Sequence, residues 1–502
     1  MSVSQAESSP NPSEKTSFDE ILRHKQEKIK ELKARGVELY PHRYAKTHSA
    51  RQSAESALES RVQTAGRVVL MRPMGKAAFA HLQDSTGKIQ VYFKQDILGA
   101  EPYQLVKAVQ AGDFVGVEGK IFKTKTGEIT IQAESVTLLC KSLRPLPEKW
   151  HGLKDVETRY RSRHLDLLAN PETFDTFRKR TVIIRAVRAV MDEAGFLEVE
   201  TPVMLPKAGG AAAKPFVTHH NALDQDLVLR IATELYLKRL IVGGYERVYE
   251  IGRIFRNEGV DTRHNPEFSM MEAYQAYADY HTMRELVEKI FDRCSSALGV
   301  EQVEYRGRTL GLKPPFRALR LPEVWQEKCG EDIHQILAGQ SFNRPALLAL
   351  AARAGNAKAE ELPSAKVFEQ IFDAKILPEL DAPTFLFDYP AAITPLAKSK
   401  PGDEALVERF EFFAAREEIA NAYSELNDPE VQRTRLEEQL RQRTQEKDEE
   451  ADILDEDFVQ ALECGMPPTG GVGIGIDRLV MILTGQASIR DVILFPTLKN
   501  VL

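Results

Sequence analysis

The chain has 502 residues, of which 43% are hydrophobic and 28% are charged, and its net charge is −7. This length predicts two or three domains whose cores need no support from disulfides or metals. The acidic total excludes a generic basic coat for nucleic acids but is compatible with a local basic surface. The four cysteines form no CxxC pair, which argues against a disulfide framework or a zinc site.

The N-terminal region gives no sign of a targeting segment. No apolar run in the chain approaches the roughly 20 residues that span a bilayer, and the first residues carry acids and no apolar stretch. We therefore expect a cytoplasmic protein without a membrane partner. Residues 1–16 are rich in Ser, Pro and Glu, and this composition predicts a disordered tail.

Residues 17–60 are predicted to form an N-terminal helical segment. Between Phe18 and Gly36 the apolar residues recur at helical spacing, and the opposite side is crowded with Lys, Arg and Glu. Two interpretations stay open for that charged side: it contacts only water, or it contacts RNA phosphates.

Residues 61–145 contain four stretches with the pattern of strands, separated by turn sequences such as Asp84-Ser85-Thr86-Gly87. Short strands at this density predict a small barrel, for which an OB-fold is a good candidate. Such barrels often bind single-stranded nucleic acid through exposed aromatic and basic side chains. Arg72 and Phe79 could serve in this way, although Phe79 is equally suited to the core.

A polar connector is predicted over residues 146–172. A long helix follows from Phe174 and ends at Gly195, because glycine is a common helix terminator. The next residues, 196–204, have the pattern of a strand.

Residues 173–502 are predicted to form one large domain with a helical insertion at about 310–380. An acidic, helix-prone stretch at 430–457 precedes a final glycine-rich strand and helix.

The segment FRNEGVDTRHNPEF, from Phe255 to Phe268, concentrates positive charge between two strand-like flanks. It contains Arg256, Arg263 and His264. A cationic hairpin loop suits a polyphosphate, because arginine makes bidentate, charge-assisted bonds to phosphate oxygens. The aromatic ring at its end offers a stacking surface for a base. The alternative is an ordinary surface hairpin with a charge cluster.

The segment GGVGIGIDR, from Gly470 to Arg478, leads into an apolar helix. It is not a P-loop, since no GK[ST] sequence follows. Its glycines would let the backbone approach a flat ligand closely, with Arg478 directed at that ligand from the helix start. Tight packing between strand and helix explains the glycines equally well.

A pair of carboxylates occurs in RFEFFAAREEIANAYSELN, residues 409–427. Glu411 and Glu418 could face one site from neighbouring strands or from one helix. Two carboxylates near phosphates are a common way to hold Mg²⁺. The alternative is a solvated amphipathic helix.

Three further acids, Glu234, Glu272 and Glu425, lie in apolar or aromatic surroundings. Buried acids need cationic partners. Either each pairs with an internal Lys or Arg, or together they form a pocket for a cationic ligand.

Together, three segments resemble the signature motifs of the class II aminoacyl-tRNA synthetases, in the order of that family. GFLEVETPVM is similar to the first motif, which implies a homodimer interface; FRNEGVDTRHNPEF is similar to the second and GGVGIGIDR to the third. The resemblance implies an α+β fold. An N-terminal OB-fold barrel would precede a catalytic domain with an antiparallel sheet flanked by helices.

The barrel narrows the resemblance to the lysine, aspartate and asparagine subgroup. Two further segments, LRPLPEKWHGLKDVETRYRSRHLDLLAN and GGAAAKPFVTHHNALDQDLVLRIATELYLKRLIVGG, resemble the bacterial lysyl-tRNA synthetases. This implies activation of L-lysine with ATP to lysyl-adenylate and pyrophosphate, and then transfer to the 3′ end of tRNA(Lys). Mg²⁺ is the implied cofactor, and the OB-fold barrel is the implied anticodon-binding domain.

The resemblance also implies roles at the nucleotide. Arg256 and Arg478 would be catalytic, with Arg256 on the α-phosphate, and Phe268 would stack on adenine. Glu411 and Glu418 would bind Mg²⁺. The full set of implied ATP contacts is Arg256, Glu258, His264, Asn265, Phe268, Glu411 and Arg478.

At the amino acid, Glu234 would bind the α-ammonium group. The implied partners of the side-chain ammonium are Glu272, Tyr274 and Glu425, and the residues that close the pocket are Gly210, Asn421 and Tyr423. In the barrel, the implied anticodon readers are Arg72, Phe79, Gln90 and Glu128. One departure concerns this pocket: Thr233 stands where bacterial relatives often have proline.

Other functions fit the sequence less well. An aspartyl or asparaginyl enzyme would need a cationic group where Glu272 and Glu425 stand. A protein-lysylating paralogue typically lacks the barrel, and a lipid-lysylating fusion would need membrane spans. A non-catalytic RNA-binding protein would be expected to have lost Arg256, Arg478 or the Mg²⁺ carboxylates, all of which are present.

Overall fold

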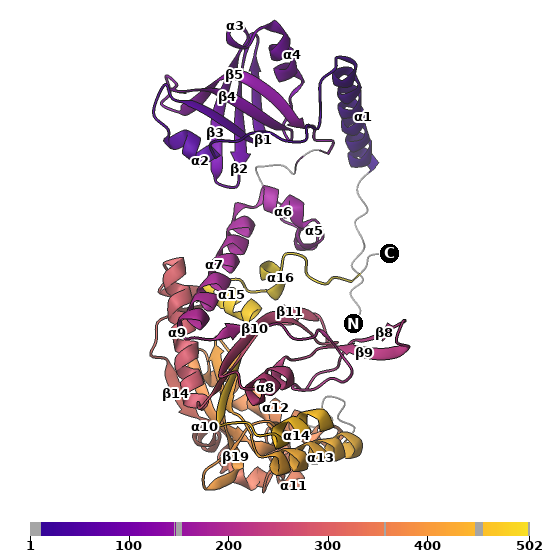
Figure 1. The fold of residues 1–502 in the computed structure, drawn as a ribbon, viewed down its shortest axis with the longest axis vertical. Coiled ribbons are helices and arrows are strands. Elements are labelled where there is room, and N and C mark those ends of the chain that lie inside the picture. Colours follow the sequence, from indigo (N-terminus) through magenta and orange to yellow (C-terminus); the bar gives the residue numbers. More distant parts are fainter. Residues whose placement is uncertain (1–11, 145, 147–152, 356–357, 447–454, 500–502) are drawn as a thin grey trace. The chain divides into compact units, whose positions relative to one another are not determined.

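The computed structural model describes residues 12–144, 146, 153–355, 358–446 and 455–499, and the chain divides into two compact units, Met1–Lys154 and Asp155–Leu502 (Figure 1). Residues 1–11 of the expected disordered tail lie outside the described residues. Helix α1 spans Pro12–Ala34, so the expectation of disorder is wrong for residues 12–16. Proline is favourable at a helix start, because its missing N–H is not needed there.

The first unit is built around a closed five-stranded barrel with the order β1-β2-β3-β5-β4, which confirms the predicted OB-fold. Its strands alternate between core and surface, so that Ala78, Ala80 and Leu82 of β2 are buried. The strands are β1 (Arg61–Met74), β2 (Ala77–Asp84), β3 (Gly87–Lys94), β4 (Phe114–Lys123) and β5 (Ile129–Cys140).

Helix α1 and three shorter helices accompany the barrel. Leu32 near the end of α1 is buried with the barrel core. The capping box of Ser49 and Gln52 starts the short helix before β1. The helices are α2 (Ala50–Glu55), α3 (Gln95–Leu98) and α4 (Ala100–Ala108).

The second unit begins with two short helices, α5 (Val156–Arg161) and α6 (Arg163–Ala169), followed by the long helix α7 (Pro171–Glu193). The long helix confirms the prediction, and Gly195 follows it with a φ of 76°, as a helix-terminating glycine does. The predicted strand at 196–204 is shorter than expected: only Leu197–Glu198 (β6) and the start of Met204–Leu205 (β7) pair.

A nine-stranded sheet forms the centre of this unit, with the order β14-β17-β19-β20-β21-β11-β10-β6 and with β18 paired to β19. All pairs are antiparallel except the two ends, β14 with β17 and β10 with β6. The main strands are β10 (Arg247–Phe255), β11 (Glu267–Ala276), β14 (Arg317–Arg320), β17 (Thr384–Pro390), β18 (Ser399–Lys400), β19 (Asp403–Ala414), β20 (Glu417–Ser424) and β21 (Thr469–Gly475).

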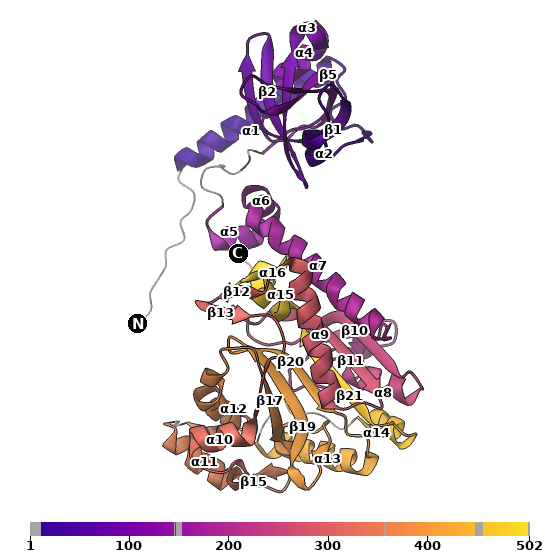
Figure 2. The ribbon, with the colours of Figure 1, turned by 90° about the vertical axis from the view of Figure 1, so that its left-hand side faces the viewer.

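Helices pack against the sheet, and the main apolar core is formed by residues of both. Helices α7 and α9 (Tyr280–Leu298) lie side by side, and with α15 (Ile476–Thr484) they bury the largest apolar cluster (Figure 2). A smaller cluster joins α8 (Glu234–Val242) and α14 (Glu456–Glu463) to β10 and β11. Helices and an antiparallel-dominated sheet confirm the predicted α+β class.

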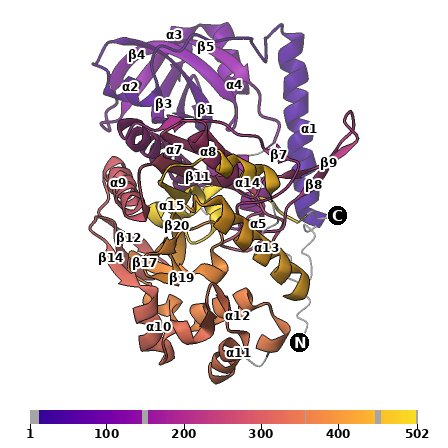
Figure 3. The same ribbon diagram turned by 60° about the horizontal axis from the view of Figure 1, so that its bottom comes forward.

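The helices of the insertion pack beside β17 and β19 (Figure 3). In their core Trp325 stacks on Phe368. Its helices are α10 (Leu321–Cys329), α11 (Arg344–Arg353) and α12 (Ser364–Lys375). The remaining elements are β8 (Val217–His220), β9 (Gln225–Leu229), β12 (Gln302–Tyr305), β13 (Arg308–Gly311), β15 (Leu337–Ala338), β16 (Ser341–Phe342), α13 (Pro429–Glu446) and α16 (Ile489–Val492). Among the described residues, no helix is long and apolar enough to cross a membrane.

Candidate active site

A cavity of about 460 Å³ opens on the face of the central sheet formed by β11, β19, β20 and β21. Every site residue that the sequence predicted for this unit lines it, from Gly210 to Arg478. They are Gly210, Glu234, Arg256, Glu258, His264, Asn265, Phe268, Glu272, Tyr274, Glu411, Glu418, Asn421, Tyr423, Glu425 and Arg478. Residues from distant parts of the sequence therefore share one cavity.

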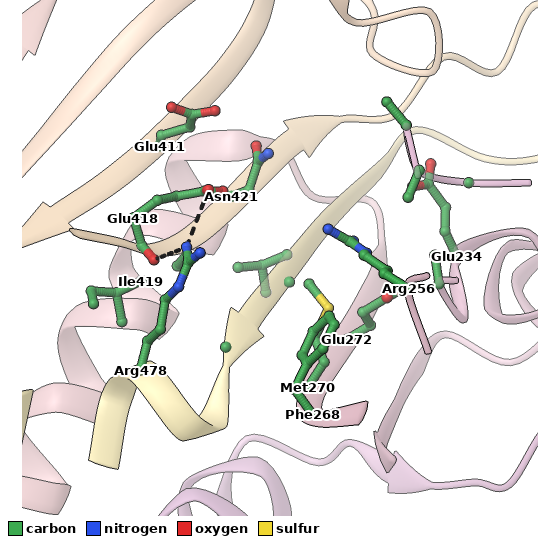
Figure 4. Close-up of a pocket in the computed structure, with 18 of the residues that line it drawn as sticks. Glu234, Arg256, Phe268, Met270, Glu272, Glu411, Glu418, Ile419, Asn421 and Arg478 are labelled. Carbon is green, nitrogen blue, oxygen red and sulfur yellow. Dashed lines mark hydrogen bonds and ion pairs between the residues drawn. The ribbon is translucent and has the colours of Figure 1, made fainter. Parts of the chain in front are cut away.

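Strand β11 places its side chains on the cavity by simple alternation. Phe268, Met270, Glu272 and Tyr274 line the cavity, whereas Met271 and its neighbours on the other face pack in the core. The strand thus carries an aromatic ring toward one end of the cavity and a carboxylate toward the other (Figure 4).

Two glycines of β21 differ in the space around their backbone, and the close packing at Gly471 involves residues on or beside neighbouring strands rather than a helix. A Cβ on Gly471 would lie 2.0 Å from Glu425 Oε1 and 2.6 Å from Tyr274 Cε1, so this glycine is required by packing. A Cβ on Gly475 would meet nothing closer than 3.8 Å. Space therefore remains beside Gly475 for a flat ligand.

The three buried glutamates meet at one end of the cavity. Glu234, Glu272 and Glu425 are 6%, 5% and 1% exposed. Two of them contact an internal cation: Lys238 Nζ lies 2.6 Å from Glu234 and 2.5 Å from Glu425. The internal-partner alternative therefore applies to Glu234 and Glu425, and because one lysine balances only one of the three carboxylate charges, two of these charges have no counter-charge from Lys238.

Glu272 has polar but no cationic contacts within ion-pair distance among the described residues. The backbone N–H of Thr233 donates to Glu272 Oε1 at 3.1 Å, and the Tyr274 hydroxyl lies 3.5 Å from Oε2. Burial, together with the charge of Glu234, raises the pKa of Glu272 to about 7. A cationic ligand beside this carboxylate would favour its charged form.

Asn421 adds a polar group without a protein partner. Its Oδ1 atom is buried and accepts no hydrogen bond from the described part of the chain. A buried acceptor of this kind costs about 1–3 kcal/mol unless it is satisfied. It therefore fits a ligand that brings a donor into the cavity.

The cationic hairpin of the sequence is a pair of strands, β10 and β11, joined by the loop 256–266. The backbone N–H of Arg256 donates to the Pro266 carbonyl at 2.9 Å and closes the base of this loop. The Arg256 guanidinium lies 5.3 Å from the centre of the Phe268 ring. A positive charge and an aromatic ring thus lie together at the entrance to the deeper pocket.

Asp261 organises the rest of the loop. Its Oδ2 atom lies 2.9 Å from the His264 ring, its Oδ1 atom accepts the N–H groups of Arg263 and His264 at 2.6 and 2.8 Å, and these contacts lower the pKa of Asp261 to about 2. The other side of the His264 ring lies 3.5 Å from Arg478. Figure 4 shows Arg478 beside Glu418 on one side of the cavity and Arg256 with Phe268 on the other.

Asn265 has a structural role in addition to lining the cavity. Its amide donates to the Glu267 carbonyl at 2.6 Å and accepts from the N–H of Thr497 at 3.2 Å. Both ends of this side chain are used by the protein, which fixes the loop against the C-terminal segment.

Glu411 and Glu418 face the cavity from neighbouring strands, so the amphipathic-helix alternative is wrong. The two-residue turn Ala415-Arg416, with φ values of 51° and 65°, folds this segment into a hairpin instead. Glu411 contacts the Tyr389 hydroxyl at 2.8 Å and the guanidinium of Arg409.

The two carboxylates fit a hard divalent cation. Burial raises the pKa of Glu411 to about 6, and the charge of Glu418 adds to this effect while Arg409 opposes it. The donors are oxygens only, which is the set that Mg²⁺ prefers, and part of Glu418 is open to the cavity. Glu411 and Glu418 could therefore hold Mg²⁺ together with phosphate oxygens.

The four predicted anticodon readers lie on one face of the barrel. Arg72 pairs with Phe79 across β1 and β2, and the Phe79 ring lies 4.7 Å from that of Tyr92. Phe79 is only partly buried, so the core alternative for it is wrong. Glu128 accepts from Gln90 at 2.7 Å and contacts His81 at 2.9 Å.

Sequence reasoning missed several residues of these sites. Lys238 falls on a helix whose pattern looks like an ordinary amphipathic one, and Thr233 acts through its backbone. Arg409 could have been found, because it is two residues from Glu411 on one strand and so shares its face. In the barrel, Tyr92 and His81 follow the same alternation as Phe79.

Comparisons with known proteins identify the family of this chain. Residues 155–499 match the family described as tRNA synthetases class II (D, K and N). The chain belongs to this family. Residues 62–139 match the family described as OB-fold nucleic acid binding domain, which corresponds to the barrel.

Curated relatives cover nearly the whole chain. A protein of Moorella thermoacetica named lysine--tRNA ligase is 51% identical over 96% of this chain and 98% of its own length. Proteins of the same name from Pelotomaculum thermopropionicum and Enterococcus faecalis are 51% and 48% identical, over 96% and 95% of this chain and 95% and 96% of theirs.

Proposed function

We propose that this class II synthetase is a lysine–tRNA ligase. It would join L-lysine to ATP as lysyl-adenylate, release pyrophosphate, and transfer the lysine to the 3′ end of tRNA(Lys). The single observation that carries the choice of lysine is the end of the cavity, where Glu234, Glu272 and Glu425 are buried around one internal cation, Lys238. Relatives of that name along the whole chain support the proposal.

In the first step, the lysine carboxylate attacks the α-phosphorus of ATP, and the bond to pyrophosphate breaks. Arg256 lies between the buried pocket and the Phe268 ring, where it can bind both the carboxylate and the α-phosphate. Arg478 faces the cavity from the start of α15 and would stabilise the leaving pyrophosphate. Catalysis of this kind rests on positioning and electrostatics and needs no covalent enzyme intermediate.

Glu411 and Glu418 are the residues that we propose for Mg²⁺. When bound, the ion would neutralise charge on the phosphate oxygens. The nearby Arg409 holds Glu411 in place and lies over the Tyr389 ring at 4.6 Å, which fixes the direction of this carboxylate.

Selection of lysine follows from charge. An apolar amino acid would leave Glu272 without a counter-charge in a buried site, which strongly disfavours its binding. The enclosed end also limits length, because Tyr274 and Gly471 close it behind Glu425. Arginine would be too bulky, and ornithine too short to reach the carboxylates.

The barrel is proposed to bind the anticodon of tRNA(Lys). Phe79 and Tyr92 offer partly exposed rings for stacking on bases, and Arg72 supplies a positive charge beside them. Gln90 is held by Glu128 and Thr130, so that its amide presents a defined edge for hydrogen bonding to a base. Residues 61–145 would then be the anticodon-binding domain.

We also propose that the protein acts as a homodimer through the segment that resembles the first motif. Strand β6 is the edge of the central sheet, and Leu197 on it is exposed. Met204 and Val217 are exposed as well, on β7 and β8, the outer strands of the three-stranded sheet β7-β9-β8. Exposed apolar residues at an unpaired sheet edge are typical of an interface.

The test is ATP–pyrophosphate exchange with each of the twenty amino acids, followed by charging of tRNA. We expect lysine alone to support rapid exchange and transfer to tRNA(Lys). Exchange that is supported by another amino acid but not by lysine would overturn the proposal.

A further inference from the structure

Lys238 is a charged side chain with no access to solvent. It lies on α8 one helical turn after Glu234 and is 0% exposed. Its ammonium group forms ion pairs with the carboxylates of Glu234 and Glu425. On its remaining side, the ring of Phe458 from α14 lies 5.8 Å from Nζ. An isolated buried ammonium group is costly, so the position is tenable because two acids surround it.

The charged and hydroxyl groups at this end of the cavity come from three elements. Helix α8 contributes Glu234, the end of β20 contributes Tyr423 and Glu425, and β11 contributes Glu272 and Tyr274. Helix α14 presents an uncharged ring. Within the described residues of this pocket end, one lysine therefore faces three carboxylates.

We propose that Lys238 is a positioning residue that neutralises one of these three carboxylates and so sets the pocket to accept an amino acid with two ammonium groups. This inference rests on the proposed function and deepens it. With lysine bound, three ammonium groups face three carboxylates, and the ligand carboxylate faces Arg256. The charges of these groups then sum to zero, whichever glutamate binds which ammonium group.

The protonation of the pocket agrees with this count. Burial lowers the pKa of Lys238, but the attraction of Glu234 and Glu425 more than offsets it and leaves that pKa raised. Burial raises the pKa of Glu425 to about 8, although Lys238 opposes the shift. Without Lys238 that opposition disappears, and the carboxyls would hold their protons to still higher pH.

The decisive variant is Lys238→Met, which keeps the apolar stem and removes the charge. The KM for lysine should rise about tenfold at neutral pH if one carboxyl pKa rises by about one unit. Raising the pH should ionise the carboxyls and bring the KM back toward the wild-type value. As the pH is lowered, the KM for lysine should therefore start to rise at a higher pH in the variant than in the wild type. The KM for ATP should stay within about twofold of the wild-type value.

Arg239→Met is the matched control. Arg239 is the next residue on α8 and pairs with Asp455 at 3.3 Å, away from the cavity. This variant should keep the wild-type pH profile of the lysine KM. A Lys238→Met enzyme whose profile superimposes on the wild type, or whose lysine KM falls, would overturn the proposal, since a merely structural lysine would change stability alone.

A measurement on the wild type decides the matter if Lys238→Met does not fold. Calorimetry of lysine binding in two buffers of different ionisation enthalpy gives the number of protons released. Near pH 7 the protein should release protons, because carboxyls with raised pKa values must ionise to balance the ligand, and binding without release would contradict the charge count. Failure of the wild type to bind lysine at all would instead refute the proposed function.

Discussion

The two ends of the cavity handle charge differently. At the amino-acid end, Glu272, Glu425 and Lys238 are buried on regular elements and make short contacts. At the nucleotide end, His264 and Arg478 are partly exposed, and their closest mutual approach is 3.5 Å. Two unit charges 4 Å apart interact by about 1 kcal/mol in water but by about 4 kcal/mol at an effective dielectric constant near 20. Selectivity should therefore reside at the buried end, whereas the exposed end can share its charges with water and phosphates.

Replacing Arg256, which we propose to bind both the lysine carboxylate and the α-phosphate, should have the largest effect on activity. Arg256→Ala should lower the rate of lysine-dependent ATP–pyrophosphate exchange by about 10²–10³-fold, the usual cost of losing a group that stabilises transition-state charge. Arg253→Ala on the preceding strand, β10, is the control, because Arg253 is exposed and pairs only loosely with Glu267 at 3.5 Å. Similar losses in both variants would mean that the cavity is not the site of activation.

Removing one buried charge should weaken lysine binding without weakening ATP binding. Glu272→Gln keeps the shape of the side chain but removes the charge that faces the ammonium group, so the lysine KM should rise about 100-fold, in line with about 3 kcal/mol for an unpaired buried charge. The KM for ATP should change little. Unchanged lysine-dependent exchange in this variant would refute the pocket assignment.

The opposite separation should follow from a change at the nucleotide end. Phe268→Leu removes the stacking surface next to Arg256, and the ATP KM should rise about tenfold, since aromatic stacking contributes about 1–1.5 kcal/mol. Discrimination among amino acids should stay as in the wild type. If this variant instead relaxed amino-acid selectivity, the two ends would not be independent.

The smallest effect should come from a backbone donor. Thr233→Pro removes both the N–H and the hydroxyl that support the charged form of Glu272, so the pKa of that carboxyl should rise above about 7. Lysine binding needs the carboxylate, so it weakens as the pH falls through this pKa, and the variant should show that loss at higher pH. The expected change in lysine KM near pH 7 is about threefold, as for a hydrogen bond of about 0.5–1 kcal/mol. An unchanged pH profile would show that the N–H is irrelevant to the charge of Glu272.

Local pattern predicted much of the fold and of the site. The two strand-like flanks of the cationic segment predicted the hairpin of β10 and β11, and helical periodicity with a terminal glycine predicted α7. The turn at Ala415-Arg416 could not be predicted, because neither residue is typical of positive φ and the hairpin is stabilised by its place in the sheet.

The ion pair of Lys238 could not be predicted for a related reason. Its partner Glu425 is 187 positions away along the chain, and only the folded sheet brings the two together. The sequence correctly indicated that the buried acids needed cations, but it left open whether a ligand or the protein would supply them. In the structure the protein supplies one cation, Lys238, and the cavity leaves space for the cationic groups of a ligand.

Selection by the buried carboxylates is tested most directly with norleucine, which has an apolar side chain in place of the lysine ammonium group. The measurement is the ratio of kcat/KM for lysine to that for norleucine in ATP–pyrophosphate exchange, in the wild type and in Glu272→Gln. We predict a wild-type ratio of about 10⁴ or more, as for sites whose buried polar groups would otherwise stay unpaired, and a much smaller ratio in the variant. Similar ratios in the two proteins would contradict the account.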